Sequence, residues 1–149
     1  DISYKQLILS SINQESKMAY YAAVNALNCA TYWDTAVDSS GVDYYPFGSF
    51  TWISSSPTFN VPSPNPKPIV CAGSSPASMI VDSVANGSTY SFTLSFPQAI
   101  GGPSQAEVKV IQGNGSNGAA AGATFITVNG YNTSNSSHPR RVQRSLDSN

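Results

Sequence analysis

The stretch Tyr4–Trp33, YKQLILSSINQESKMAYYAAVNALNCATYW, decides the fold because neither proline nor glycine interrupts it. Its apolar residues recur at spacings of three and four, which is the period of one face of an α-helix. They are Tyr4, Ile8, Ile12, Ala19, Ala22, Ala23, Ala26, Leu27, Ala30 and Trp33. The pattern predicts one amphipathic helix of about 30 residues, about 45 Å long at a rise of about 1.5 Å per residue.

The two halves of this helix differ in composition. Polar side chains dominate from Ser10 to Lys17, whereas the second half is rich in alanine. We expect the second half to pack on a sheet and the first half to project. A projecting amphipathic half-helix needs partners to bury its apolar residues; the alternative is a solvated extension that frays in isolation. If such partners are copies of the chain or other subunits, the residues expected to face them are Tyr4, Leu7, Ile8, Ile12 and Tyr20.

Residues 34–68 lose the helical period and are punctuated by prolines from Pro46 to Pro68. We expect a long connection from helix to sheet, held by its aromatic residues as an ordered wrap over the core. Those aromatic residues are Tyr44, Tyr45, Phe47, Phe50, Trp52 and Phe59. Long loops in compact domains are usually functional or are flexible linkers. This one is a candidate surface binding loop, with Tyr44, Tyr45, Phe47 and Trp52 as contact residues.

Residues 69–149 change to a period of two, which is typical of half-buried strands. The clearest run alternates the apolar residues Tyr90, Phe92, Leu94 and Phe96 with serine and threonine. Further strands are predicted over 79–84, 108–112, 125–128 and, at the end, 141–146. Asn86-Gly87, Gly101-Gly102-Pro103 and the segment 113–122 supply turn residues between them. A helix over 1–33 followed by consecutive strands predicts one α+β domain, a long N-terminal α-helix packed on an antiparallel β-sheet.

The composition is typical of a protein that functions outside the cell. Charged residues make up only 10% of the 149 residues, compared with roughly 25% in an average soluble protein. Their place is taken by Ser, Thr, Asn and Gly, which indicates an extracellular or filament-forming surface. In such a protein, Cys29 and Cys71 are expected to form one disulfide that closes a loop of about 43 residues and contributes up to about 4 kcal/mol. The alternative is two buried free thiols that behave as small apolar residues.

The sequence offers no catalytic, metal or cofactor motif, so we expect no enzyme activity. The single histidine, His138, lies in a polar stretch without an acid or nucleophile at motif spacing, which is typical of a surface residue. Asp34, Asp38 and Asp43 could supply oxygen ligands to calcium, but their spacing does not match the EF-hand pattern, and turn acids are the favoured alternative.

Three arginines near the C-terminus, Arg140, Arg141 and Arg144, could contact phosphates. The net charge of −1 gives no long-range attraction for nucleic acid. A solvated strand, or salt bridges to the acids, is therefore favoured over nucleic-acid contact.

Two motifs resemble the type IV pilin-like and minor pilin family. ESKMAYYAA at 15–23 and LNCATYWD at 27–34 are similar to the "AFYAADxxIECALYWD" stretch that ends the first helix of such proteins. GYNT at 130–133 and PRRVQR at 139–144 are similar to their "GYNT…PRRVER" ending, and Cys71 matches a cysteine between the two motifs. The rest of the central part is similar only in style.

The resemblance implies a pilin-like fold and a structural subunit that polymerises through its N-terminal helix into a cell-surface filament for adhesion, motility or uptake. An apolar half-helix anchors such subunits in the inner membrane before assembly. That half-helix, the prepilin cleavage site and the early glutamate of the family do not occur here, so we expect Asp1 to be a truncated start. The alternative is a minor or tip pilin, or a secretion pseudopilin, acting as a binding module.

Overall fold

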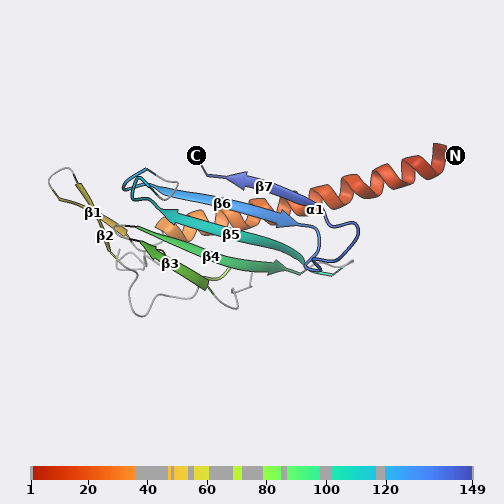
Figure 1. Ribbon diagram of the computed structural model, residues 1–149. Coiled ribbons are helices and arrows are strands. Elements are labelled where there is room, and N and C mark those ends of the chain that lie inside the picture. Colours follow the sequence, from red (N-terminus) through yellow and green to blue (C-terminus); the bar gives the residue numbers. More distant parts are fainter. Residues whose placement is uncertain are drawn as a thin grey trace.

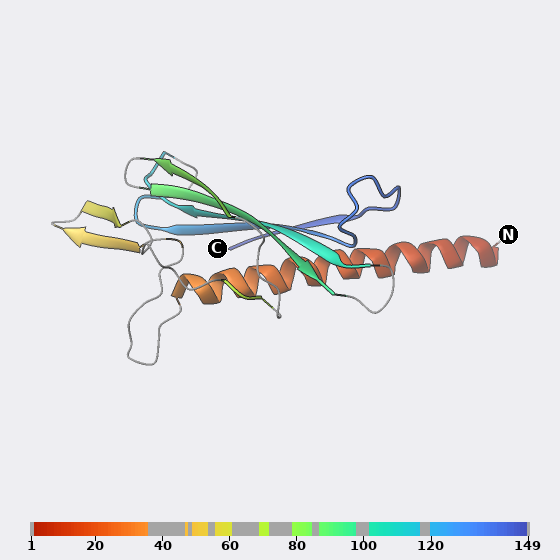
Figure 2. The same cartoon turned by 90° about the horizontal axis from the view of Figure 1, so that it is seen from below.

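One long helix dominates the computed structural model, which describes residues 2–35, 47, 49–53, 56–60, 69–71, 79–84, 87–97, 102–116 and 120–148. Helix α1 spans Ile2–Thr35 and has 34 residues. Its C-terminal part lies along one face of a sheet, and its N-terminal part extends beyond the sheet edge (Figure 1, Figure 2). The helix predicted from the proline- and glycine-free stretch is confirmed, with about two more residues at each end.

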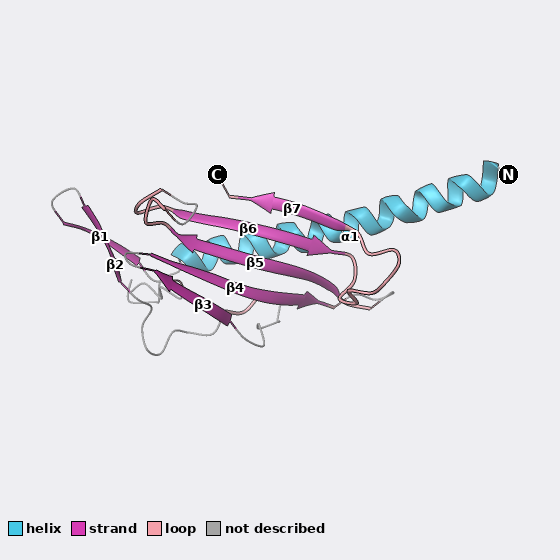
Figure 3. Cartoon of the chain, viewed as in Figure 1, coloured by secondary structure: helices cyan, strands magenta, loops and turns pink. Residues whose placement is uncertain are grey.

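Five antiparallel strands form the sheet, in the order β3-β4-β5-β6-β7 (Figure 3). Their bounds are Met79–Val84, Gly87–Phe96, Ser104–Gln112, Thr124–Tyr131 and Gln143–Asp147. Each strand pairs with the next along the chain, and the predicted glycine-rich connectors contain the positive-φ residues Gly102, Gly115 and Gly122. The predicted α+β class with one helix on an antiparallel sheet is confirmed. Strand β7 begins two residues later than expected, after Arg141 and Val142.

The core lies between α1 and the inner face of the sheet. Large side chains at alternate positions of β4, together with Val108, Val110 and Val128, are buried against the helix. The fully buried residues of the helix are all alanines: Ala19, Ala22, Ala23, Ala26 and Ala30. Towards its C-terminal end, Leu27, Cys29 and Trp33 are partly buried and also pack against the core. Because alanine adds little bulk, the helix backbone can approach the strands closely.

The closest approach occurs at Gly130 in β6. A Cβ atom on this residue would lie 2.6 Å from the Ala23 nitrogen and 2.8 Å from the Ala23 Cβ, and it would overlap the carbonyl oxygen of Ala19. Gly130 does not have a positive φ. It is therefore glycine because the helix backbone occupies the space of any side chain.

The disulfide predicted between Cys29 and Cys71 is present, with the two Cα atoms 5.7 Å apart. The neighbouring Trp33 donates a hydrogen bond from Nε1 to the carbonyl oxygen of Val70, at 3.2 Å. Ile69 and Cys71 are both buried in the core. The segment 69–71 is therefore held to the last turns of α1 by one covalent and one polar link.

The connection predicted over 34–68 contains a short hairpin that the sequence did not indicate. Strands β1, Ser49–Ile53, and β2, Ser56–Asn60, pair antiparallel, with Trp52 opposite Pro57. The prolines in and around this segment argued against strands in the sequence. In a two-stranded ribbon, however, each strand has one edge without backbone hydrogen bonds, and proline is tolerated there.

Candidate assembly surface on the projecting helix

Large apolar side chains are exposed on the part of α1 that extends beyond the sheet. Their exposed fractions range from 40% for Ile8 to 75% for Ile2. The full set in this part is Ile2, Tyr4, Leu7, Ile8, Leu9 and Ile12. We call these six residues the apolar tip.

The residues of the apolar tip are spread over more than half of the helix circumference, with Lys5 exposed among them. At about 3.6 residues per turn, Ile8 and Ile12 continue the line of the buried alanines, whereas Leu7 and Leu9 lie to either side of it. The remaining side is a polar strip formed by Ser3, Gln6, Ser10, Asn13 and Lys17, all of them exposed. A helix that is apolar on most sides is normally buried. The tip is therefore a large apolar surface that the described part of the chain leaves exposed.

The five residues expected to face other subunits are all exposed, but only four of them belong to the tip. Tyr20, with 47% exposure, lies on the half of α1 that packs on the sheet, and its ring centroid is 6.0 Å from that of Tyr21. Four more exposed apolar residues of α1 were not predicted: Ile2, Leu9, Tyr21 and Tyr32. They lie outside the three-and-four spacing of the packed face. Only their apolar character could have predicted them from the sequence.

The structure describes only part of the candidate binding loop, and it shows that the predicted role of Phe47 as a contact residue is wrong. Phe47 is fully buried, with its ring stacked on Phe92 at a centroid distance of 5.9 Å. It therefore holds the connection to the core, as expected of the aromatic wrap, and is not an exposed contact residue. Tyr44, Tyr45 and the side chain of Trp52 lie outside the described part of the chain.

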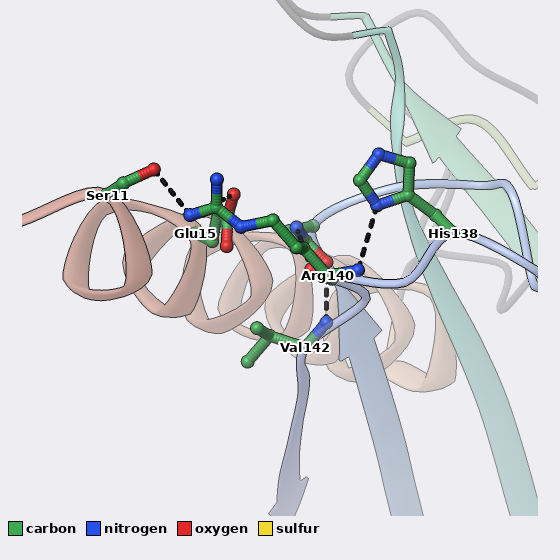
Figure 4. Close-up of polar contacts among 6 residues, drawn as sticks. Ser11, Glu15, His138, Arg140 and Val142 are labelled. Atoms are coloured by element: carbon green, nitrogen blue, oxygen red, sulfur yellow. Dashed lines mark hydrogen bonds and ion pairs between the residues drawn. The ribbon is translucent and has the colours of Figure 1, made fainter. Parts of the chain in front are cut away.

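The loop between β6 and β7, residues 132–142, reaches back to the helix just beyond the sheet (Figure 4). Arg140 forms an ion pair with Glu15 at 3.1 Å and donates a hydrogen bond to the hydroxyl of Ser11 at 2.6 Å. His138 is exposed, as predicted, and its Nδ1 accepts a hydrogen bond from the backbone N–H of Arg140.

The other two arginines are also engaged within the chain. The guanidinium of Arg141 lies 3.6 Å from the centre of the Tyr131 ring. The Tyr131 hydroxyl donates to Glu107 at 2.9 Å, and burial together with this carboxylate raises the pKa of Tyr131. Arg144 donates to the carbonyl oxygen of Gln143. These contacts favour the salt-bridge and structural interpretation of the three arginines.

At the other end of α1, Asp34 is tied to the sheet. Its Oδ1 accepts a hydrogen bond from the Gln112 side-chain amide at 3.1 Å and lies 3.4 Å from the Thr124 hydroxyl. Burial raises the pKa of Asp34 above its ordinary value of 3.8, and the two hydrogen bonds partly oppose that shift. Of the three acids considered for calcium, Asp38 and Asp43 lie outside the described residues. Within the described ranges no cluster of metal-binding side chains occurs.

Replacing Asp34 by asparagine is expected to stabilise the domain at pH 7 more than at pH 3. Because the folded-state pKa is raised, the stability of the native protein falls as the pH rises from about 3.8 through that pKa. Asparagine keeps the oxygen acceptor but never carries the buried charge. Urea unfolding of both proteins at both pH values measures the difference.

A control variant and one contradicting outcome complete this prediction. Asp34→Ala removes the acceptor offered to Gln112, so we expect it to lose about 1 kcal/mol of unfolding free energy at either pH. An Asp34→Asn change with the same effect at pH 3 and pH 7 would show that the carboxylate is not destabilised in the folded protein.

Comparisons with known proteins do not assign the chain to a family. No protein-family model, curated protein or solved structure matches the chain. Among the residues that the structure describes, no helix has a stretch long and apolar enough to cross a membrane.

Proposed function

We propose that this protein is a structural subunit of a type IV pilus-like cell-surface filament and that its copies polymerise through the projecting half of α1. The observation that supports the proposal best is the apolar tip, six large side chains exposed on a helix that extends beyond its own sheet. Full burial of such side chains stabilises by about 1.5–3 kcal/mol each. A contact along the tip can therefore supply the affinity that a polymer needs.

The rest of the molecule supports this function. The long helix on an antiparallel sheet is compatible with the fold that the resemblance at 15–34 and 130–144 implies. The disulfide agrees with the expectation from the composition. The low charge content agrees with a surface outside the cell. In this proposal the chemistry is packing, the partners are copies of the chain or related subunits, and no reaction is catalysed. The subunit is held in the inner membrane before assembly and lies in an extracellular filament afterwards.

The test is cryo-electron microscopy of filaments sheared from cells that make the protein. We expect the domain to repeat along the shaft, with α1 directed inward and the apolar tip covered by neighbouring helices. Density for the domain only at one end of the filament would favour a minor or tip pilin, or a pseudopilin. Filaments that lack the domain altogether would contradict the proposal.

A charge at the tip is expected to prevent assembly. Leu7→Glu should reduce the amount of protein in filaments more than tenfold, because an unpaired carboxylate buried between helices costs several kcal/mol. Leu7 has 68% exposure, so the change should not alter the thermal unfolding of the separate domain. The measurement is immunoblotting of sheared filaments against the cell-associated protein.

Ser10→Glu is the matched control because it places the same charge three residues away, in the polar strip. It should assemble like the native protein. Equal assembly of both variants would show that the apolar tip is not a subunit contact.

A further inference from the structure

Support for α1 by the sheet decreases towards its N-terminus. From Ala19 onward, alanines at the packed positions are buried, and Gly130 lies directly against Ala19 and Ala23. Residues 2–10 are all exposed. Between these two parts, Ser11, Glu15, Ser16 and Met18 are half-buried, and the side chains of Ser11 and Glu15 both contact Arg140.

The loop holds Arg140 in place before the side chain reaches the helix. The Asn132 side chain accepts a hydrogen bond from the Val142 N–H at 2.7 Å and donates one to the Arg140 carbonyl at 3.1 Å. The Arg140 N–H donates to His138 Nδ1 at 3.2 Å. Both backbone polar groups of Arg140 thus form hydrogen bonds inside the loop. The contact of the guanidinium with Ser11 and Glu15 therefore costs little further backbone conformational entropy.

We infer that Arg140 is a positioning residue that fixes the direction in which the projecting half of α1 leaves the domain. The first fully buried residue of α1 is Ala19, about 26 Å from Ile2, whereas the contact with Arg140 also holds the helix at Ser11, about 14 Å from Ile2. Because the displacement of the tip grows with the length of the free helix, a bend at Ser11 moves Ile2 about half as far as the same bend at Ala19.

For assembly, the consequence rests on the proposed function. If copies pack through the apolar tip, a tip held in one direction costs less conformational entropy to order in the polymer. The positioning effect itself is a property of the single chain and can be measured without any filament.

The test is amide hydrogen exchange of the chain Asp1–Asn149 and of its Arg140→Gln variant. An exposed ion pair contributes up to about 1 kcal/mol, and the charged hydrogen bond to Ser11 adds to it. We expect amides 12–18 to exchange about three- to tenfold faster in the variant, with amides 22–30 and the thermal midpoint unchanged. Arg144→Gln is the matched control because, among the residues that the structure describes, this arginine bonds to its neighbour Gln143, and the change should leave exchange in α1 unchanged.

Charge reversal separates positioning from a general loss of stability. The double variant Glu15→Arg/Arg140→Glu restores an ion pair between the same positions and should recover most of the protection at 12–18. Native-like exchange at 12–18 in Arg140→Gln would overturn the inference. Equal acceleration across all of α1 would also overturn it, because that result means general destabilisation. Absence of the protein from filaments would instead contradict the proposed function and leave these exchange rates unaffected.

Discussion

Gly130→Ala is expected to be the most damaging conservative substitution in the sheet, lowering the free energy of unfolding by about 3 kcal/mol or more. The added Cβ would lie 2.6 Å from the backbone nitrogen of Ala23 and would overlap the carbonyl oxygen of Ala19. A flexible side chain could move aside, but these are backbone atoms of a helix. Either β6 or α1 must therefore shift, which opens gaps elsewhere in a densely packed core.

Gly102 provides a control with the opposite cause. It has a φ of 79°, and a Cβ there would meet no atom within 4 Å. Gly102→Ala should cost about 1–2 kcal/mol through backbone strain alone. Chemical denaturation of both variants compares the two costs, and the prediction fails if Gly130→Ala is the milder of the two. Ala23→Gly should not rescue Gly130→Ala, because the backbone contacts remain after the Ala23 Cβ is removed.

Local patterns predicted the regular part of this fold. The uninterrupted run from Tyr4 to Trp33 predicted α1, and the alternation from Tyr90 to Phe96 predicted β4 and which of its faces is buried. Both features depend on neighbours in sequence. The β1–β2 hairpin was missed because prolines usually interrupt strands. Phe47 was expected both in the aromatic wrap and as a surface contact, and only the structure shows that it is buried, because an aromatic residue in a loop has no periodic neighbours to orient it.

The candidate site was predicted from the helix period at some positions, whereas Leu7, which lies beside the packed face, was selected for its apolar character. That period selected Ile8 and Ile12, which continue the packed face, but it gave no reason to select Ile2 or Leu9 on other sides of α1. The contact between Arg140 and Ser11 joins residues 129 positions apart, so no local pattern could indicate it. The motif at 130–133 includes Gly130 and Asn132, but their roles, close packing and loop clamping, became clear only from the three-dimensional arrangement.

Removal of the disulfide is expected to lower the free energy of unfolding by about 4 kcal/mol. In the chain-entropy model, a bridge across 42 positions restricts the unfolded chain by about that amount. For a domain of this size the loss corresponds to a thermal midpoint lower by roughly 10 °C. The variant Cys29→Ala/Cys71→Ala tests this by urea unfolding, and it avoids placing a hydroxyl at the buried position of Cys71.

The same experiment distinguishes restriction of the unfolded chain from packing of the sulfur atoms. Reduction of the native protein leaves two thiols in nearly the same place, so an entropic bridge predicts the same loss for reduction as for the double alanine variant. If reduction leaves stability unchanged while the alanines lower it, the cysteines act mainly as buried apolar residues, and the bridge contributes little. A large loss on reduction would mean that the segment 69–71 depends on the covalent link, since the hydrogen bond from Trp33 to Val70 contributes only about 1 kcal/mol. The stable form of the protein would then require an oxidising compartment, which agrees with the extracellular location that we propose.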